Sequence, residues 1–222
     1  MLSSFTNTAA ILALASLVTA APHLSLPAQL QLADTAIEKY PLLTKDKDFV
    51  FDFNNAPFPL ANRKSFPALI GSDLAIAIAE IPACSMASLH IHPRSAEIFA
   101  VLSGRIYTEM IPESGVIVDP KTDPKPRVVR TELTAKQTTI FPMGSFHAQV
   151  NPDCTPALTI AAFSSDDPGA ALVVPQTLII SDEFVTSSFG GGLSAEELAR
   201  FRAAVPQGAI FEVEACKKRC GL

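Results

Sequence analysis

Two short segments of the chain carry residues whose types and spacing suit a metal site. The first runs from His90 to Glu97 (His-Ile-His-Pro-Arg-Ser-Ala-Glu), and the second contains His147. Side chains two positions apart on a β-strand point to the same face, so His90 and His92 can present two imidazoles together. The proline after His92 lacks the amide that a ladder needs, which predicts a turn at 93–96 and a second strand from Glu97. Three imidazole nitrogens and one carboxylate oxygen can then surround a divalent ion and leave positions open for water or substrate.

The alternative is that these histidines are ordinary core or surface residues, as a lone histidine in an apolar strand usually is. The chain has four histidines, and three fall in these two segments, while His23 lies near a predicted cleavage site. This concentration favours a metal site. The donors suit Mn²⁺ or Fe²⁺ with six ligands, and Zn²⁺ is the competing ion, although four protein ligands would close a tetrahedral zinc to substrate. A redox-active ion there could disproportionate superoxide or oxidise a small carboxylic acid beside dioxygen. No separate catalytic side chain is identified.

The composition predicts one compact domain with short extensions. The chain has 222 residues, of which 48% are hydrophobic and 18% charged, which is enough to bury a core. The formal charge is −5, and the basic residues cluster only at 217–219, so nucleic acid finds little to bind.

The N-terminus resembles a secretory leader. Residues 1–20 carry no charged side chain and contain an apolar run at 9–18 that ends in Val-Thr-Ala. This predicts a signal peptide cleaved after Ala20 and a secreted, extracellular protein. The run is shorter than the roughly 20 residues that a spanning helix needs, and no later segment is long enough, so no membrane partner is expected.

The remaining chain divides into an N-terminal arm at 21–47, a strand-rich domain at 48–189 and a helical tail at 190–222. Alternating or apolar runs bounded by turn residues predict an all-β fold, with strands near 49–53, 73–81, 86–92, 97–102, 104–111, 127–133, 138–141, 146–151, 156–163 and 171–174. In the arm, residues 28–37 have helical spacing. In the tail, Ser194 and Glu197 form a capping box that opens a helix at 195–204, and a second helix is expected at 212–220.

Several further residues were assigned from their positions on these strands. Gln149 shares the face of His147 and is a candidate hydrogen-bond partner next to the ligands. Asn151 is expected to close a turn rather than to bind metal. Five apolar residues are candidates for the cavity wall or the core: Phe99, Val101, Ile140, Phe146 and Leu158.

Four cysteines in a secreted chain predict two disulfides, with three possible pairings, and free thiols are the alternative. The cysteines are Cys84, Cys154, Cys216 and Cys220. Residues paired across two antiparallel strands have a nearly constant sum of residue numbers. Cys84 with Cys154 has nearly the sum of His92 with His147, which predicts a Cys84–Cys154 disulfide and, by elimination, Cys216–Cys220.

The paired motifs resemble those of the cupin superfamily. The first motif, His-x-His-x4-Glu-x6-Gly, is met by His90, His92, Glu97 and Gly104. The second, Pro-x-Gly-x2-His-x3-Asn, is met by Pro142, Gly144, His147 and Asn151. The sequence of residues 90–98 is similar to that of germins and germin-like proteins, including the spherulin branch. The resemblance covers roughly residues 45–205.

This resemblance implies a single jelly-roll β-barrel with an N-terminal arm and C-terminal helices, secretion, bound manganese and homo-oligomers clasped by the C-terminal helices. It also implies an oxidoreductase of superoxide dismutase or oxalate oxidase type. The alternative is an extracellular or cell-wall protein that the metal only stabilises, or a small-ligand-binding protein without catalysis. Three positions depart from the family pattern: Cys84 and Lys136 replace glycines, and Ala87-Ser88-Leu89 lacks the asparagine that oxalate oxidases carry just before the first histidine.

Overall fold

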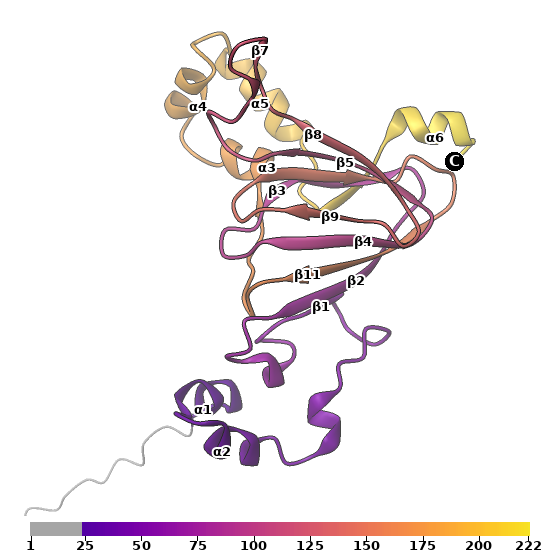
Figure 1. Cartoon of the computed structure of the whole chain (residues 1–222). Helices are drawn as coiled ribbons and strands as arrows, with labels where there is room; N and C mark the ends of the chain where they lie inside the picture. Colours follow the sequence, from indigo (N-terminus) through magenta and orange to yellow (C-terminus); the bar gives the residue numbers. More distant parts are fainter. Residues whose placement is uncertain (1–23) are drawn as a thin grey trace, which may run out of the picture.

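Two antiparallel sheets form the body of the molecule in the computed structural model, which describes residues 24–222 (Figure 1). The predicted signal peptide at 1–20 and His23 lie outside the described residues. Between residues 24 and 222, no helix combines the length and the apolar character that crossing a membrane requires.

The first sheet has the strand order β1-β2-β11-β4-β9. Its strands are β1 (Leu60–Ala61), β2 (Ala75–Ile81), β4 (Glu97–Ser103), β9 (Thr138–Phe141) and β11 (Ala157–Phe163). The second sheet has the order β12-β3-β10-β5-β8, and β13 also pairs with β3. Its strands are β3 (Ser85–Ile91), β5 (Arg105–Ile111), β8 (Val129–Thr134), β10 (Phe146–Val150), β12 (Ala171–Leu172) and β13 (Ile210–Glu212). A separate hairpin joins β6 (Ile117–Asp119) and β7 (Asp123–Pro126).

The main core lies between these two sheets. Burial alternates along the strands, as in β11, where every second residue from Ala157 to Phe163 is buried. The core combines residues of both sheets, including Phe99 and Val101 of β4 and Ile106 of β5. Within the described residues no ladder joins the sheets, so the pairing is that of a two-sheet sandwich, consistent with a jelly roll, and does not by itself close a barrel.

The predicted strands between 73 and 163 are confirmed to within about two residues at most ends, because alternation and turn residues marked them clearly. The strand predicted at 49–53 is wrong. A 3-10 helix, η2 (Asp46–Phe49), occupies its start, and the rest belongs to no strand. Its phenylalanines pack locally instead, since the rings of Phe51 and Phe53 lie 4.8 Å apart and Phe51 also contacts Phe66. The alternation therefore reflected aromatic packing of a loop.

The N-terminal arm lies beside the β1 edge of the first sheet (Figure 1). It contains α1 (Leu26–Leu32), α2 (Ala36–Lys39) and two 3-10 helices, η1 (Tyr40–Leu42) and η2, and a third, η3 (Pro67–Leu69), follows β1. The helix expected over 28–37 is split, because Thr35 and Glu38 form a capping box that begins α2. Leu30 and Leu43 pack on Ile70, which attaches the arm to the domain.

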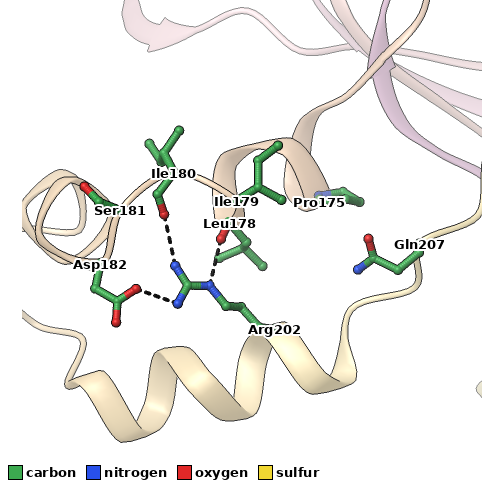
Figure 2. Close-up of a pocket in the computed structure, with 8 residues that line it drawn as sticks. All are labelled: Pro175, Leu178, Ile179, Ile180, Ser181, Asp182, Arg202 and Gln207. Carbon is green, nitrogen blue, oxygen red and sulfur yellow. Dashed lines mark hydrogen bonds and ion pairs between the residues drawn. The ribbon is translucent and has the colours of Figure 1, made fainter.

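A three-helix cluster follows the strands: α3 (Val173–Leu178) and α4 (Asp182–Ser188) lie before residue 190, and α5 (Ala195–Ala204) lies in the C-terminal tail. Helix α5 and its Ser194–Glu197 capping box are as predicted. Figure 2 shows Arg202 of α5 in a pocket of about 470 Å³ beside α3, donating to the carbonyl oxygens of Leu178 and Ile180 and pairing with Asp182. These bonds fix α5 against the end of α3 and the start of α4. The guanidinium of Arg202 therefore has a structural role.

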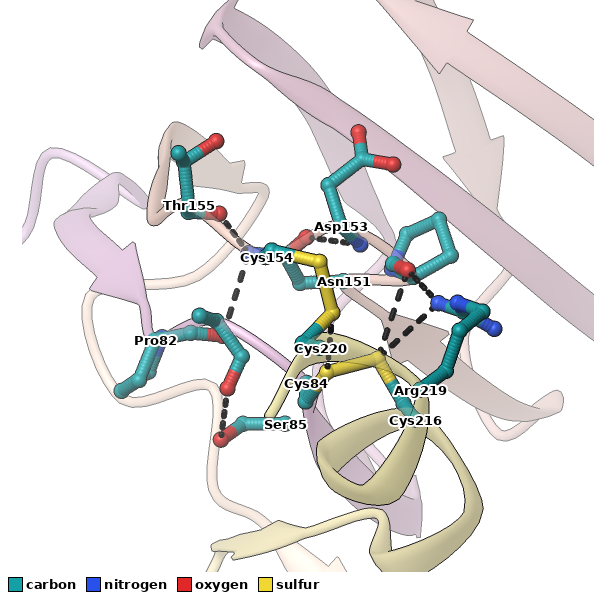
Figure 3. The surroundings of a disulfide bond; sticks show 12 residues. Pro82, Cys84, Ser85, Asn151, Asp153, Cys154, Thr155, Cys216, Arg219 and Cys220 are labelled. Carbon is teal, nitrogen blue, oxygen red and sulfur yellow. Dashed lines mark hydrogen bonds between the residues drawn. A yellow bond between two sulfur atoms is a disulfide. The ribbon is translucent and has the colours of Figure 1, made fainter. Parts of the chain in front are cut away.

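The disulfide pairing predicted from the sequence is wrong. The structure joins Cys84 to Cys216 and Cys154 to Cys220, so both bridges tie helix α6 (Glu214–Cys220) to the sheet (Figure 3). The two bridges are adjacent, since the Sγ atoms of Cys84 and Cys220 lie 3.4 Å apart.

Three physical reasons explain the error. The register of β3 and β10 shifts by one residue between His147 and Gln149, and continuing the pairing of Val150 with Met86 places Cys84 opposite residue 152, two short of Cys154. The prediction also took His92 as the residue opposite His147, whereas the structure pairs His90 with His147. In addition, Cys216 and Cys220 are four apart in a helix, where Cβ atoms are about 5–6 Å apart, whereas a disulfide needs about 3.5–4.5 Å. The predicted helix 212–220 was therefore incompatible with a disulfide inside it.

The two glycine departures lie where the backbone takes the left-handed conformation. Cys84 has φ of 52° and Lys136 has φ of 71°. Glycine adopts this region without the steric contact between Cβ and the carbonyl oxygen that other residues suffer. Cys84 is held there by its disulfide, while Lys136 is exposed in the β8–β9 turn and has only its backbone bond to Val101.

We expect Lys136→Gly to raise the free energy of unfolding by about 0.5–1 kcal/mol, because relief of the left-handed strain exceeds the added entropy of the unfolded chain. Urea denaturation followed by circular dichroism measures this. Lys121→Gly, at an exposed turn residue without positive φ, is the matched control and should be neutral or destabilising. Equal effects of the two substitutions would contradict the strain at position 136.

We expect the double substitution Cys154→Ser with Cys220→Ser to lower the free energy of unfolding by about 2–4 kcal/mol, because the bridge closes a long loop of the unfolded chain. Denaturation with and without reductant measures the loss. Peptide mapping of the variant should still find Cys84 linked to Cys216. Recovery of a Cys84–Cys154 peptide from the wild-type chain would refute the observed pairing.

Candidate metal centre

The structure brings together the four residues that the sequence predicted as ligands. One ligand atom from each of His90, His92, Glu97 and His147 lies within 4.8 Å of every other. The Oε2 of Glu97 is 2.9 Å from Nε2 of His92 and 3.2 Å from Nε2 of His147. Within residues 24–222 the only other such cluster is Cys84, Cys216 and Cys220, whose sulfurs are engaged in disulfides.

The two sheets share the positioning of this cluster. His90 lies near the end of β3, directly opposite His147 on β10. His92 follows β3, and the turn beyond it carries the chain to the other sheet, where Glu97 is the first residue of β4. The carboxylate therefore faces the imidazoles across the space between the sheets, as the predicted turn at 93–96 requires.

A local irregularity in β3 sets the direction of His90. Between the pairs His147–His90 and Gln149–Ala87, β3 uses three residues where β10 uses two, as in a β-bulge. The extra residue places His90 and Ala87, three apart in sequence, on the same cavity. Such an irregularity has no signature in the alternation pattern, so the sequence did not predict it.

Backbone carbonyl oxygens orient all three imidazoles. The Nδ1 of His90 lies 2.6 Å from the carbonyl oxygen of Ser88, that of His92 lies 2.6 Å from Gly169, and that of His147 lies 2.9 Å from Ser145. Because a carbonyl only accepts, each neutral ring must carry its proton on Nδ1 and leave the Nε2 lone pair free. Metal-binding histidines in proteins are typically held in this way.

Gly169 is part of this arrangement that sequence analysis missed. It has φ of 68°, and a Cβ there would lie 2.8 Å from the guanidinium of Arg94, so the position favours glycine. The Pro168-Gly169 pair was a turn signal, but nothing local linked it to His92, 77 residues earlier.

Aromatic rings hold two of the imidazoles in place. The ring of His147 is stacked on Phe141 with centroids 4.2 Å apart and planes within 9°. Phe163 meets His92 edge-on at 4.8 Å. Since His147 and Glu97 are only 1% and 3% exposed, these groups are held by packing rather than by solvent.

The pKa shifts follow from burial and from the Glu97 charge. Burial and, to a smaller extent, the neighbouring His147 lower the pKa of His90 to about 4. For His92, burial favours the neutral form, but the hydrogen bond and charge of Glu97 outweigh it and raise the pKa above the usual 6.5. Burial alone would raise the pKa of Glu97, yet hydrogen bonds from Nε2 of His147 and His92 lower it to about 2. These bonds need a proton on Nε2, and a metal would take the place of that proton. The carboxylate is thus ionised at any physiological pH.

The donor set fits a divalent transition metal. Three Nε2 lone pairs and one ionised carboxylate converge, and these are donors that Mn²⁺, Fe²⁺ and Zn²⁺ accept. All four side chains are held by packing or hydrogen bonds that leave the donor atoms directed at one point. The residues could therefore hold a metal ion.

A cavity of about 290 Å³ opens beside the cluster. Phe99 lines it as predicted, and Val101 lies in the main core. The other three predicted wall residues are wrong: Ile140, Phe146 and Leu158 are 55%, 40% and 36% exposed. Each precedes a buried or ligating residue on its strand, so alternation directs it to the outer face.

The two polar candidates on β10 and beyond it take different roles. Gln149 lines the cavity, is 3% exposed, and its Oε1 has no hydrogen-bond partner among the described residues. Asn151 is a structural turn residue as predicted, since its amide donates to the carbonyl oxygens of Ile81, Pro82 and Thr155. The unpaired Oε1 of Gln149 is therefore a candidate acceptor for a donor group of a bound molecule.

Comparisons with known proteins agree with this geometry. The model of the family described as Cupin matches residues 42–196. Spherulin-1A of Physarum polycephalum is 31% identical over 208 residues, covering 88% of this chain and 79% of that protein. Germin-like protein 8-2 of Oryza sativa subsp. japonica is 31% identical over 135 residues, covering 59% of this chain and 57% of that protein.

Among solved structures, an oxalate oxidase in complex with the substrate analogue glycolate superposes with a TM-score of 0.54 at 20% identity, covering 72% of this chain and 79% of that one. At this identity the likeness shows a shared fold. The family match and the similarity to spherulin both extend over the four clustered side chains. The chain therefore belongs to the cupin family, with spherulins and germin-like proteins among its relatives.

Proposed function

We propose that this chain is a secreted cupin that binds one Mn²⁺ through His90, His92, Glu97 and His147 and there either disproportionates superoxide or oxidises a small carboxylic acid with dioxygen. The observation that carries the proposal is the set of three Nδ1–carbonyl contacts, which leave Nε2 of each neutral ring available to a metal beside the carboxylate of Glu97. Fe²⁺ and Zn²⁺ are the competing ions for the same donors. We further propose that the two sheets form the jelly-roll barrel of the family.

The side chains divide the work at the site. The bound metal would supply Lewis acidity and one-electron redox capacity. Glu97 brings negative charge to a buried point, and the three imidazoles would bind the metal through Nε2. The apolar lining of the cavity keeps water away from a molecule beside the cluster, and Gln149 offers it an amide. A small carboxylic acid and superoxide are the two substrates proposed, since both can bind a redox metal directly.

Secretion and assembly belong to the same proposal. Two disulfides in one chain are typical of an oxidising compartment, which supports the extracellular location. Several large apolar side chains of the C-terminal helices are exposed, among them Ile179, Phe184 and Phe201. Exposed apolar groups of this kind often mark an interface, which supports a homo-oligomer.

A structural role for the metal is the competing proposal. The four candidate ligands come from both sheets, so an ion there would cross-link the sandwich without any reaction. The two proposals differ in whether removing the metal abolishes an activity or only lowers stability.

We expect Glu97→Gln to lower Mn²⁺ affinity at least 100-fold, because the substitution removes the only anionic donor. Metal content after dialysis and the electron paramagnetic resonance spectrum of Mn²⁺ measure this, and superoxide and oxalate assays follow activity. Glu80→Gln, at an exposed position of β2, is the matched control and should bind normally. Equal activity in loaded and metal-free protein would remove the catalytic proposal and leave the structural one.

We expect metal affinity to fall about tenfold for each pH unit below the pKa of His92, because one proton then competes with the ion. That pKa lies above 6.5, so the loss begins near neutral pH and deepens as acid is added. Below about pH 4 His90 also takes a proton, and the dependence becomes steeper. Titrations between pH 8 and 4, with circular dichroism to verify folding, measure the slope. An affinity that stays constant from pH 7 to 5 would contradict this assignment.

A further inference from the structure

We propose that the cavity beside the metal centre accepts a small monocarboxylic acid with an apolar body, in preference to a short dicarboxylate. The carboxylate would lie at the four ligands and the apolar body along a wall formed by Ala87 and Ile210. This inference rests on the proposed function, because it names the substrate class of the same site.

The lining of the cavity has few polar side chains. They are His90, His92, Glu97, Gln149 and Thr159, and the hydroxyl of Thr159 already donates to the carbonyl oxygen of Ala79. Gln149 lies opposite Ala87 on the neighbouring strand. The lining contains no lysine or arginine, and its other members are apolar or glycine. A molecule bound here therefore meets polar partners at the metal centre and at Gln149, and mostly apolar surface elsewhere.

This distribution discriminates between anions. A single carboxylate can direct its charge to the metal centre. A dianion whose second carboxylate turned away from that centre would bury a charge against apolar groups with no cation to pair it, which is strongly unfavourable. An apolar body in the same place would instead gain free energy by leaving water.

The C-terminal strand supplies part of the wall. Ile210 of β13 pairs with Ala87, and the Ser88 amide donates to the carbonyl oxygen of Ala209 at 2.7 Å. Both Ala209 and Ile210 line the cavity. The chain directly after β13 is α6, which both disulfides attach to the sheet, so this wall is fixed covalently.

Ala87 makes the remaining space apolar next to the metal centre. The irregularity of β3 brings its methyl group to the cavity beside His90. A longer polar side chain at this position would bring a hydrogen-bonding group into the cavity, whereas alanine presents only a methyl group.

The volume sets the size of the apolar body. A cavity of about 290 Å³ is at the lower end of small-molecule sites. Since a water molecule occupies about 30 Å³, the cavity holds on the order of ten non-hydrogen atoms. An acid of about six carbons fits, whereas acetate leaves most of the apolar surface unused.

The test compares hexanoate, acetate and oxalate by calorimetric titration of the Mn²⁺-loaded full chain, with the Mn²⁺ paramagnetic resonance spectrum as a second readout of ligand binding. We expect hexanoate to bind at least tenfold more tightly than either acetate or oxalate. Ile210→Ser should weaken hexanoate binding about tenfold and change acetate binding less than twofold. Ile37→Ser, at an isoleucine of the N-terminal arm that is 85% exposed and outside this cavity, is the matched control and should change neither.

Ile210→Val keeps a β-branched residue in the strand and covers the case that Ile210→Ser disturbs folding. It should weaken hexanoate binding two- to fivefold with an unchanged melting temperature. Oxalate binding as tightly as hexanoate, or equal weakening of hexanoate and acetate by the Ile210 substitutions, would overturn the inference.

Metal content, measured first, separates this inference from the proposed function. If the chain binds no metal, the proposed function fails, and neutral hexanamide and acetamide are then titrated into the metal-free protein. A preference for hexanamide that Ile210→Ser removes would support the apolar wall by itself, and the lack of any preference would overturn it.

Discussion

The buried carboxylate of Glu97 is the group on which the site and the meeting of the two sheets depend. A charge that is 3% exposed needs partners, since an unpaired buried carboxylate is strongly destabilising. Its partners, His92 and His147, come from the opposite sheet, so the contact also fixes how the sheets face each other across the cavity. The hydrogen bonds that hold Glu97 ionised are the contacts that a metal would replace, which explains why the chain can maintain this geometry before an ion binds.

Strand β3 positions most of the groups around Glu97. It pairs with β10 along the ligand side and with β12 and β13 on its other side, and its one-residue irregularity directs both His90 and Ala87 to the cavity. The carbonyl oxygen of Ser88, within that irregularity, accepts from His90, and the Ser88 amide donates to the C-terminal strand. The irregularity of β3 thus orients His90, brings Ala87 to the cavity beside it and binds the C-terminal segment that lines the same cavity.

The sequence was sufficient for the ligands and most strands, because these depend on local rules. The spacing of His90 and His92, the proline that ends their strand and the alternation along 73–163 needed no knowledge of the partner strand. The sequence was insufficient where the structure depends on contacts between two segments that are distant in the chain. The pairing of Cys84 depended on a register shift that alternation does not encode, and the aromatic alternation at 49–53 lacked a partner strand. Ile140 and Phe146 were misplaced for a simpler reason, since a neighbour of an inward residue on a strand must face outward.

The same distinction between local and distant contacts applies to the site. The ligand motif is local in the sequence and is shared with relatives, whereas the cavity wall depends on contacts between distant segments of this chain. The ligand motif matches the general cupin pattern, so it points to a metal ion and says little about the substrate. In the proposed site, the substrate would also meet residues outside the motif: Ala87, three positions before the first ligand, and Ile210, which the C-terminal strand brings to the site. Two disulfides hold the helix after that strand, so the segment that carries Ile210 is attached covalently to the turns at Cys84 and Cys154. Selectivity at this wall depends on polarity, since an apolar wall without a cation selects against a second charge.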